Sequence, residues 1–104
     1  FMIGGDGELR KDFEHQVREA GMQEKIIFTG HLDDTTPYFN IFDIFCLPTL
    51  REGFGVVFAE AQACGVPVVA SDIAALREVV CDGVTGKLVS VGDVDGFADA
   101  LRSL

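Results

Sequence analysis

Short runs of apolar residues alternate along this chain with stretches in which apolar residues recur at helical spacing. Each run has three to five residues and ends near a glycine, a proline or a polar residue, which is typical of short buried strands. We expect five such strands, over residues 1–4, 25–29, 44–47, 66–70 and 87–89.

The segments between these runs carry helix signals. Leu9, Phe13, Val17 and Ala20 repeat at helical spacing, and Thr36 before a proline is typical of a helix cap. We expect further helices over 55–64, 73–80 and 94–104. Because the segment 55–64 is apolar on nearly every side, it predicts a buried helix.

Strands that alternate with helices predict an α/β fold, with a Rossmann-like parallel sheet of about five strands and helices on both faces. Such sheets bind ligands at the carboxyl ends of their strands. The predicted loops over 4–7, 29–32 and 49–55 all follow strands, so they are the candidate binding loops.

Composition narrows the classes of partner. The chain has 104 residues, sized for a single domain, and its net charge of −9 disfavours binding to nucleic acid. Three widely spaced cysteines, Cys46, Cys64 and Cys81, fit buried thiols of a cytoplasmic protein better than disulfides. His15 and His31 form no ligand-like spacing with them, so we expect no metal site.

The most informative segment runs from residue 48 to residue 60. Gly53 and Gly55 permit close approach of the backbone, and the amides at the start of the following helix can hold an anion such as a diphosphate. Glu52 lies before that helix and Glu60 within its second turn, where carboxylates can accept sugar hydroxyls. Each glutamate alone also fits a solvated surface position.

At these residues the chain resembles the group 1, or family four, retaining glycosyltransferases. Glu52 and Glu60, with seven residues between them, match the paired-glutamate motif of that family. The resemblance covers nearly the whole chain, in the family's order and spacing, through the segments 5–7, 28–30, 52–55, 60–71 and 82–86 and through Asp43.

The resemblance implies the C-terminal, nucleotide-sugar-binding domain of a two-domain GT-B enzyme. Glu52 and Glu60 are then the candidate catalytic pair, with Glu52 on the donor sugar and Glu60 on the ribose; no nucleophile is assigned. The implied substrate-binding residues are Gly53, Phe54, Gly55, Val56 and Val57, with Gly5, Gly30, His31 and Leu32 bordering the nucleobase. No cofactor or metal is implied, and family members also work at the cytoplasmic face of the membrane.

Two features depart from the family. Ala74 and Ala75 stand where a glycine pair is common, and the earlier strand and loop that carry the family's basic residues are absent from this chain. The sequence starts within a predicted strand and stops within a predicted helix, so we expect a partial donor domain whose acceptor domain lies elsewhere.

Three functions remain open at this point. The leading hypothesis is retaining transfer of a hexosyl group from a nucleotide-diphosphate sugar to an acceptor. The first alternative is a catalytically silent nucleotide-binding module or subunit, and the second is a related epimerase. An incomplete sheet exposes an edge, so we also expect self-association or a domain-swapped dimer.

Overall fold

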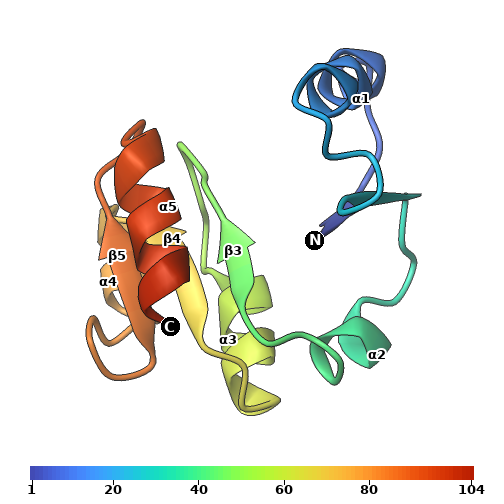
Figure 1. The fold of residues 1–104 in the computed structure, drawn as a ribbon. Coiled ribbons are helices and arrows are strands. Elements are labelled where there is room, and N and C mark those ends of the chain that lie inside the picture. Colours follow the sequence, from blue (N-terminus) through green and yellow to red (C-terminus); the bar gives the residue numbers. More distant parts are fainter. The chain divides into compact units, whose positions relative to one another are not determined.

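The computed structural model describes all 104 residues, which fold into two compact units, residues 1–35 and 36–104 (Figure 1). The first unit contains strand β1 (Met2–Gly4), helix α1 (Arg10–Glu19) and strand β2 (Ile27–Gly30). The two strands are parallel, with a register shift between Ile3 and Gly4. This β-α-β unit confirms the predicted alternation at the start of the chain.

The second unit is a parallel three-stranded sheet in the order β3-β4-β5, with four helices. Its elements are α2 (Thr36–Phe39), β3 (Phe45–Leu47), α3 (Val56–Ala63), β4 (Val68–Ser71), α4 (Ala74–Arg77), β5 (Gly86–Val89) and α5 (Val94–Ser103). The five predicted strands are therefore confirmed and parallel, but they belong to two sheets, of two and three strands.

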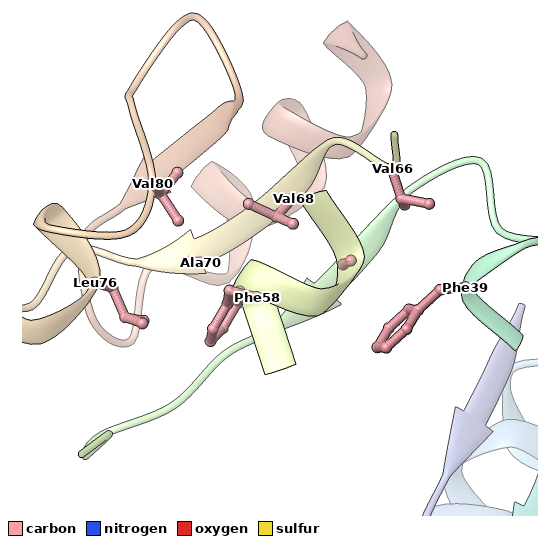
Figure 2. Close-up of a cluster of buried hydrophobic side chains, with 8 residues drawn as sticks. Phe39, Phe58, Val66, Val68, Ala70, Leu76 and Val80 are labelled. Atoms are coloured by element: carbon pink, nitrogen blue, oxygen red, sulfur yellow. The ribbon is translucent and has the colours of Figure 1, made fainter. Parts of the chain in front are cut away.

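The central strand β4 is buried on both faces, because its side chains alternate between two hydrophobic clusters. Val68 and Ala70 face the cluster that contains Phe58 of α3 and Leu76 of α4 (Figure 2). Val69 faces the other cluster, which α5 covers with two buried residues. Helices thus cover both faces of the three-stranded sheet, as its continuous apolar strands predict.

Aromatic rings fill much of the first cluster. Phe39 and Phe45 lie edge to face with ring centroids 5.4 Å apart, and Phe45 and Phe58 follow at 5.5 Å. Such pairs add to the stability that their burial already gives. Phe1 and Phe54 lie outside the cluster instead, with 78% and 86% of their surfaces exposed.

Two predictions about helices need correction. The helix α3 is not buried all round: Phe58 and Ala61 are buried, whereas Val56 is 58% exposed. An apolar composition does not require burial on every side when only one face meets the sheet. The helix expected over 73–80 is shorter, four residues in α4, with turns after it.

The cysteines also differ from expectation. All three are free thiols, which agrees with the absence of a predicted disulfide, but only Cys46 is half-buried. Cys64 is the C-cap of helix α3 and Cys81 starts a turn, and both are exposed. Burial raises the pKa of the Cys46 thiol.

The longest helices have ten residues, and none could cross a membrane.

Candidate functional site at the start of helix α3

The segment 48–55 connects the end of β3 to the start of α3, and hydrogen bonds anchor its first residues. The Thr49 amide donates to the Ser71 hydroxyl at 2.9 Å, and the Thr49 hydroxyl donates to the Arg51 carbonyl at 2.7 Å. The segment therefore leaves the carboxyl end of one strand while it is tied to the end of the next. This position is where α/β sheets bind their ligands.

Gly55 caps helix α3 in a left-handed conformation, with φ 66° and ψ 31°. It is buried, and a Cβ atom at this position would lie 2.8 Å from Cδ2 of Leu76 and 3.3 Å from Cγ2 of Val79. Only glycine meets both demands without strain. The start of α3 consequently packs close against the segment that follows β4.

The first turn of α3 offers unpaired donors. The Gly55 carbonyl accepts from the amides of Phe58 and Ala59. The backbone amides of Val56 and Val57 donate to no group of the chain. Two such amides at the positive end of a helix dipole favour an anion. The predicted anion-binding helix start is thus present as a backbone geometry.

The two glutamates lie on either side of this helix start along the chain. Glu52 is half-buried in the loop, and Glu60 is the fifth residue of α3 with an exposed side chain. Neither carboxylate forms a hydrogen bond or an ion pair within the chain. Both are therefore available to accept hydrogen bonds from a ligand.

The apolar residues of the loop are turned outward. Leu50 is 78% exposed and Phe54 is 86% exposed, and Gly53 has open space where a side chain would stand. The structure thus presents the predicted substrate-binding backbone at 53–57 on an accessible surface, apart from the buried Gly55.

In the first unit, the predicted nucleobase residues lie at the ends of β1 and β2 or just beyond them. The Gly5 amide donates to the Gly30 carbonyl at 2.9 Å, and both glycines have positive φ. Leu32 is half-buried and reaches to 3.3 Å from the position of a Cβ on Gly4. His31 is exposed instead and lies 3.2 Å from Asp33.

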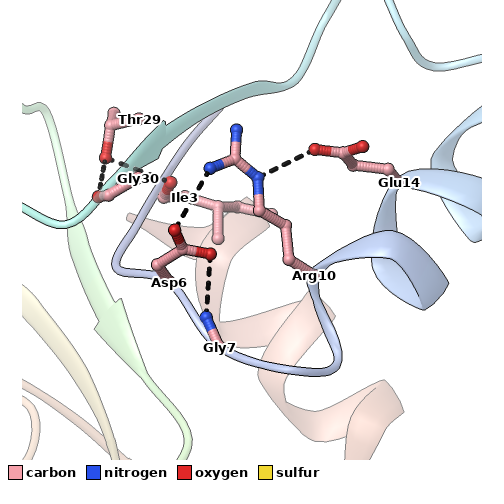
Figure 3. Close-up of polar contacts among 7 residues, drawn as sticks. All are labelled: Ile3, Asp6, Gly7, Arg10, Glu14, Thr29 and Gly30. Carbon is pink, nitrogen blue, oxygen red and sulfur yellow. Dashed lines mark hydrogen bonds and ion pairs between the residues drawn. The ribbon is translucent and has the colours of Figure 1, made fainter.

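Arg10 supports this loop, a role that the sequence did not reveal (Figure 3). Its Nε donates to Glu14 at 2.9 Å, and its Nη1 lies 3.7 Å from Asp6, whose other oxygen accepts from the Gly7 amide. The hydrogen bond to Glu14 raises the pKa of Arg10. The same guanidinium lies 3.3 Å from where a Cβ would stand on Gly30. Spacing of four residues on a helix is the signal that would have found the Glu14 pair.

The stretch that departs from the family pattern also has its own geometry. Arg77 forms a bidentate pair with Asp72, at 2.6 Å and 3.2 Å. This hydrogen bonding lowers the pKa of Asp72. Arg77 is therefore committed to a carboxylate in this structure, and Ala74 begins α4 with an exposed side chain.

A shallow hollow of about 520 Å³ lies elsewhere in the second unit, beside β5 and α5. Asp82, Asp93 and Asp99 contribute three carboxylates to its lining, against the single cation of Lys87. This charge disfavours a diphosphate. The start of α3 is the better candidate on chemical grounds.

The chain resembles known proteins over most of its length. The family model described as glycosyl transferases group 1 matches residues 1–104. A phosphatidyl-myo-inositol mannosyltransferase of Mycobacterium leprae is 44% identical, over 88% of this chain and 26% of that protein. Its counterpart in Mycolicibacterium smegmatis is 48% identical, over 85% of this chain and 24% of that protein. The chain thus spans about a quarter of the length of these relatives.

Solved structures give the same picture. HepE of Anabaena, in complex with UDP, matches with a TM-score of 0.90 at 27% identity, over 98% of this chain and 30% of that chain. The C-terminal domain of LpcC, a group 1 family protein of Francisella tularensis, matches with a TM-score of 0.82 at 31% identity, over 93% of this chain and 51% of that chain. With a family match from the first residue to the last, the chain belongs to the group 1 glycosyltransferases.

Proposed function

We propose that this chain forms part of the donor-binding domain of a two-domain, retaining glycosyltransferase. The observation that carries the proposal is the start of α3, where the amides of Val56 and Val57 are unpaired and the carboxylates that precede and follow them in the sequence, Glu52 and Glu60, have no partners. The amides suit a diphosphate, and the carboxylates suit the hydroxyls at its two ends.

In this proposal Glu60 binds the ribose hydroxyls and Glu52 contacts the hydroxyls of the donor sugar. The backbone of residues 53–57 contacts the sugar and the phosphates. During transfer, the bond between the anomeric carbon and the diphosphate oxygen breaks, and that oxygen keeps the electron pair. Helix α3 stabilises the charge that develops there, which is an electrostatic contribution to catalysis. The acceptor oxygen then bonds to the anomeric carbon on the same face, and its proton passes to the departing diphosphate oxygen.

We assign the nucleobase to Gly5, Gly30, His31 and Leu32, as the resemblance to the family implies. These residues lie at or just beyond the ends of β1 and β2, and the hydrogen bond between Gly5 and Gly30 shapes their backbone. The likeness to HepE in complex with UDP supports a nucleoside diphosphate as the common part of the donor. The proposed reaction uses no cofactor or metal ion.

The remainder of the enzyme lies outside these residues in this proposal. We assign both units to one partial donor domain, residues 1–104, and the acceptor domain to the rest of the full-length protein. Relatives about four times as long support this assignment. The three free thiols support a reducing, cytoplasmic compartment.

A silent nucleotide-binding module is the rival function, and the same geometry would serve it. The two functions differ in turnover. A full-length transferase releases nucleoside diphosphate from a nucleotide-sugar when acceptor is present, whereas a silent module binds the nucleotide without releasing product. Retention or inversion follows from the anomeric configuration of the product by NMR, and an inverted product would contradict the retaining mechanism.

The isolated chain is also proposed to self-associate. Strand β3 pairs only with β4, so its other edge carries unpaired backbone groups. Light scattering of the 104-residue chain over a concentration series should show a mass above one chain. A constant monomer mass at high concentration would refute this part of the proposal.

The binding test is calorimetric titration with UDP, GDP and their glucose and mannose conjugates. We expect saturable binding of one nucleotide, weakened about tenfold by Glu60→Gln, because the neutral amide is a poorer acceptor for two hydroxyls. Asp95→Asn, an equally isosteric change at an exposed site on α5, is the matched control. Equal affinities for wild type and Glu60→Gln would remove the ribose role of Glu60.

A further inference from the structure

Ser71 is an unusual residue in the second unit, because it is the one polar residue that is buried. It ends β4, the strand covered on both faces, and it is 1% exposed. A buried hydroxyl costs stability unless it is hydrogen-bonded. The partner here is the Thr49 amide, 22 residues away along the chain.

The contact continues from Thr49 toward the loop. The Thr49 hydroxyl donates to the Arg51 carbonyl at 2.7 Å, and the Arg51 amide lies 3.3 Å from the same oxygen. Glu52 is the next residue. A short series of hydrogen bonds therefore leads from the rigid centre of the sheet to the peptide that carries the Glu52 side chain.

This series holds one end of the loop, and the other end is held separately. Gly55 is fixed by its packing against Leu76, whereas Gly53 and Phe54 between the two anchors are exposed. Loss of the Ser71 hydroxyl would leave the Thr49 amide without its acceptor and free the first half of the loop. Glu60 sits on α3, beyond the second anchor, and would keep its place.

We propose that Ser71 is a positioning residue, which orients Glu52 toward the donor sugar through Thr49. The proposal rests on the proposed function of Glu52. Its specific consequence is selective: Ser71 affects recognition of the sugar and leaves recognition of the nucleotide intact.

The experiment compares two ligand pairs, UDP with UDP-glucose and GDP with GDP-mannose, in the full-length protein that carries this chain. Ser71→Ala should weaken binding of the nucleotide-sugar roughly fivefold to tenfold, the worth of about one well-placed hydrogen bond. The affinity for the matching nucleotide should change less than twofold. Ser103→Ala, which removes a hydrogen bond within α5, should change neither.

A second variant and a double-mutant cycle with Glu52→Ala keep the test independent of effects on folding. Thr49→Val removes the hydroxyl link at a half-buried site and should reproduce the selective loss, while thermal unfolding of all variants is followed in parallel. In a Glu52→Ala background, Ser71→Ala should have no further effect, because both changes remove the same contact.

The outcomes distinguish a failure of the proposed function from a failure of the proposed role of Ser71. Wild-type protein that binds neither ligand pair overturns the proposed function, and the role of Ser71 with it. A wild type that binds, combined with equal losses for nucleotide and nucleotide-sugar in both variants, overturns the role of Ser71 alone. So does a Ser71→Ala effect that persists in the Glu52→Ala background.

Discussion

Replacement of Gly55 by alanine tests whether the tight start of helix α3 makes the site. A Cβ in the left-handed conformation costs about 1–2 kcal/mol. The 2.8 Å approach to Leu76 adds about 1–3 kcal/mol, because a packed side chain must move. The more restricted unfolded chain of an alanine variant returns about 0.4–1 kcal/mol. We expect a net loss of about 1–5 kcal/mol.

Gly65→Ala is the matched control, just beyond the other end of the same helix. Gly65 has a similar φ of 77°, but no atom lies within 4 Å of the position of its Cβ. Its replacement therefore carries the backbone cost without the clash, and the two variants should differ by about 1–3 kcal/mol. Denaturant unfolding of both variants measures this difference.

Binding provides the second readout of the same pair. A shifted start of α3 moves the amides of Val56 and Val57, so Gly55→Ala should weaken UDP or GDP binding about tenfold, and Gly65→Ala should leave it unchanged. Equal stability losses in the two variants would refute the packing argument. Normal nucleotide binding by a destabilised Gly55→Ala protein would show that the helix start does not hold the diphosphate.

Three further predictions concern the core, the pH dependence and the thiols. Phe58→Ala should lower the free energy of unfolding by about 3–5 kcal/mol, because the ring is fully buried against other rings; chemical denaturation measures this, and a loss below 1 kcal/mol would contradict the packing. The pair of Asp72 with Arg77 lowers the folded-state pKa of the carboxyl, so its stabilisation is complete above the ordinary carboxyl pKa and is lost as the pH falls through the lowered value. Unfolding of wild type and Asp72→Asn should therefore differ at neutral pH and converge in strong acid; a constant difference would exclude this linkage. Cys46 should react with a thiol reagent more slowly than the other two cysteines, because burial raises its pKa; equal rates by mass spectrometry would contradict its half-buried position.

The sequence predicted the elements well because their signals are local. Continuous apolar runs such as 68–70 identify strands without knowledge of their neighbours, and the glycine before Val56 marks a helix start. The same local signals placed Glu52 in a loop and Glu60 on a helix, which the structure confirms.

The missed features depend on contacts between distant segments. Ser71 and Thr49 are 22 residues apart, and no local sequence pattern at either residue indicates that the two form a hydrogen bond. The exposed side of α3 was missed because an apolar residue does not have to be buried, and valine is also found at surface positions. The exposure of Cys64 was missed for a similar reason, because its position at the end of a helix, and not the apolar residues near it in the sequence, determines whether it is buried.

The start of α3 offers its two unpaired donors from the main chain, and this has a consequence for how such a protein diverges. Substitution of Val56 or Val57 by another residue with a backbone amide keeps both donors, so mutation can explore these positions without loss of an anion's main contact. The carboxylates on either side have no such protection, because each contact vanishes with a single codon change. Under the proposed function, descendants of one ancestor can thus exchange one donor sugar for another and keep the same backbone donors for the diphosphate.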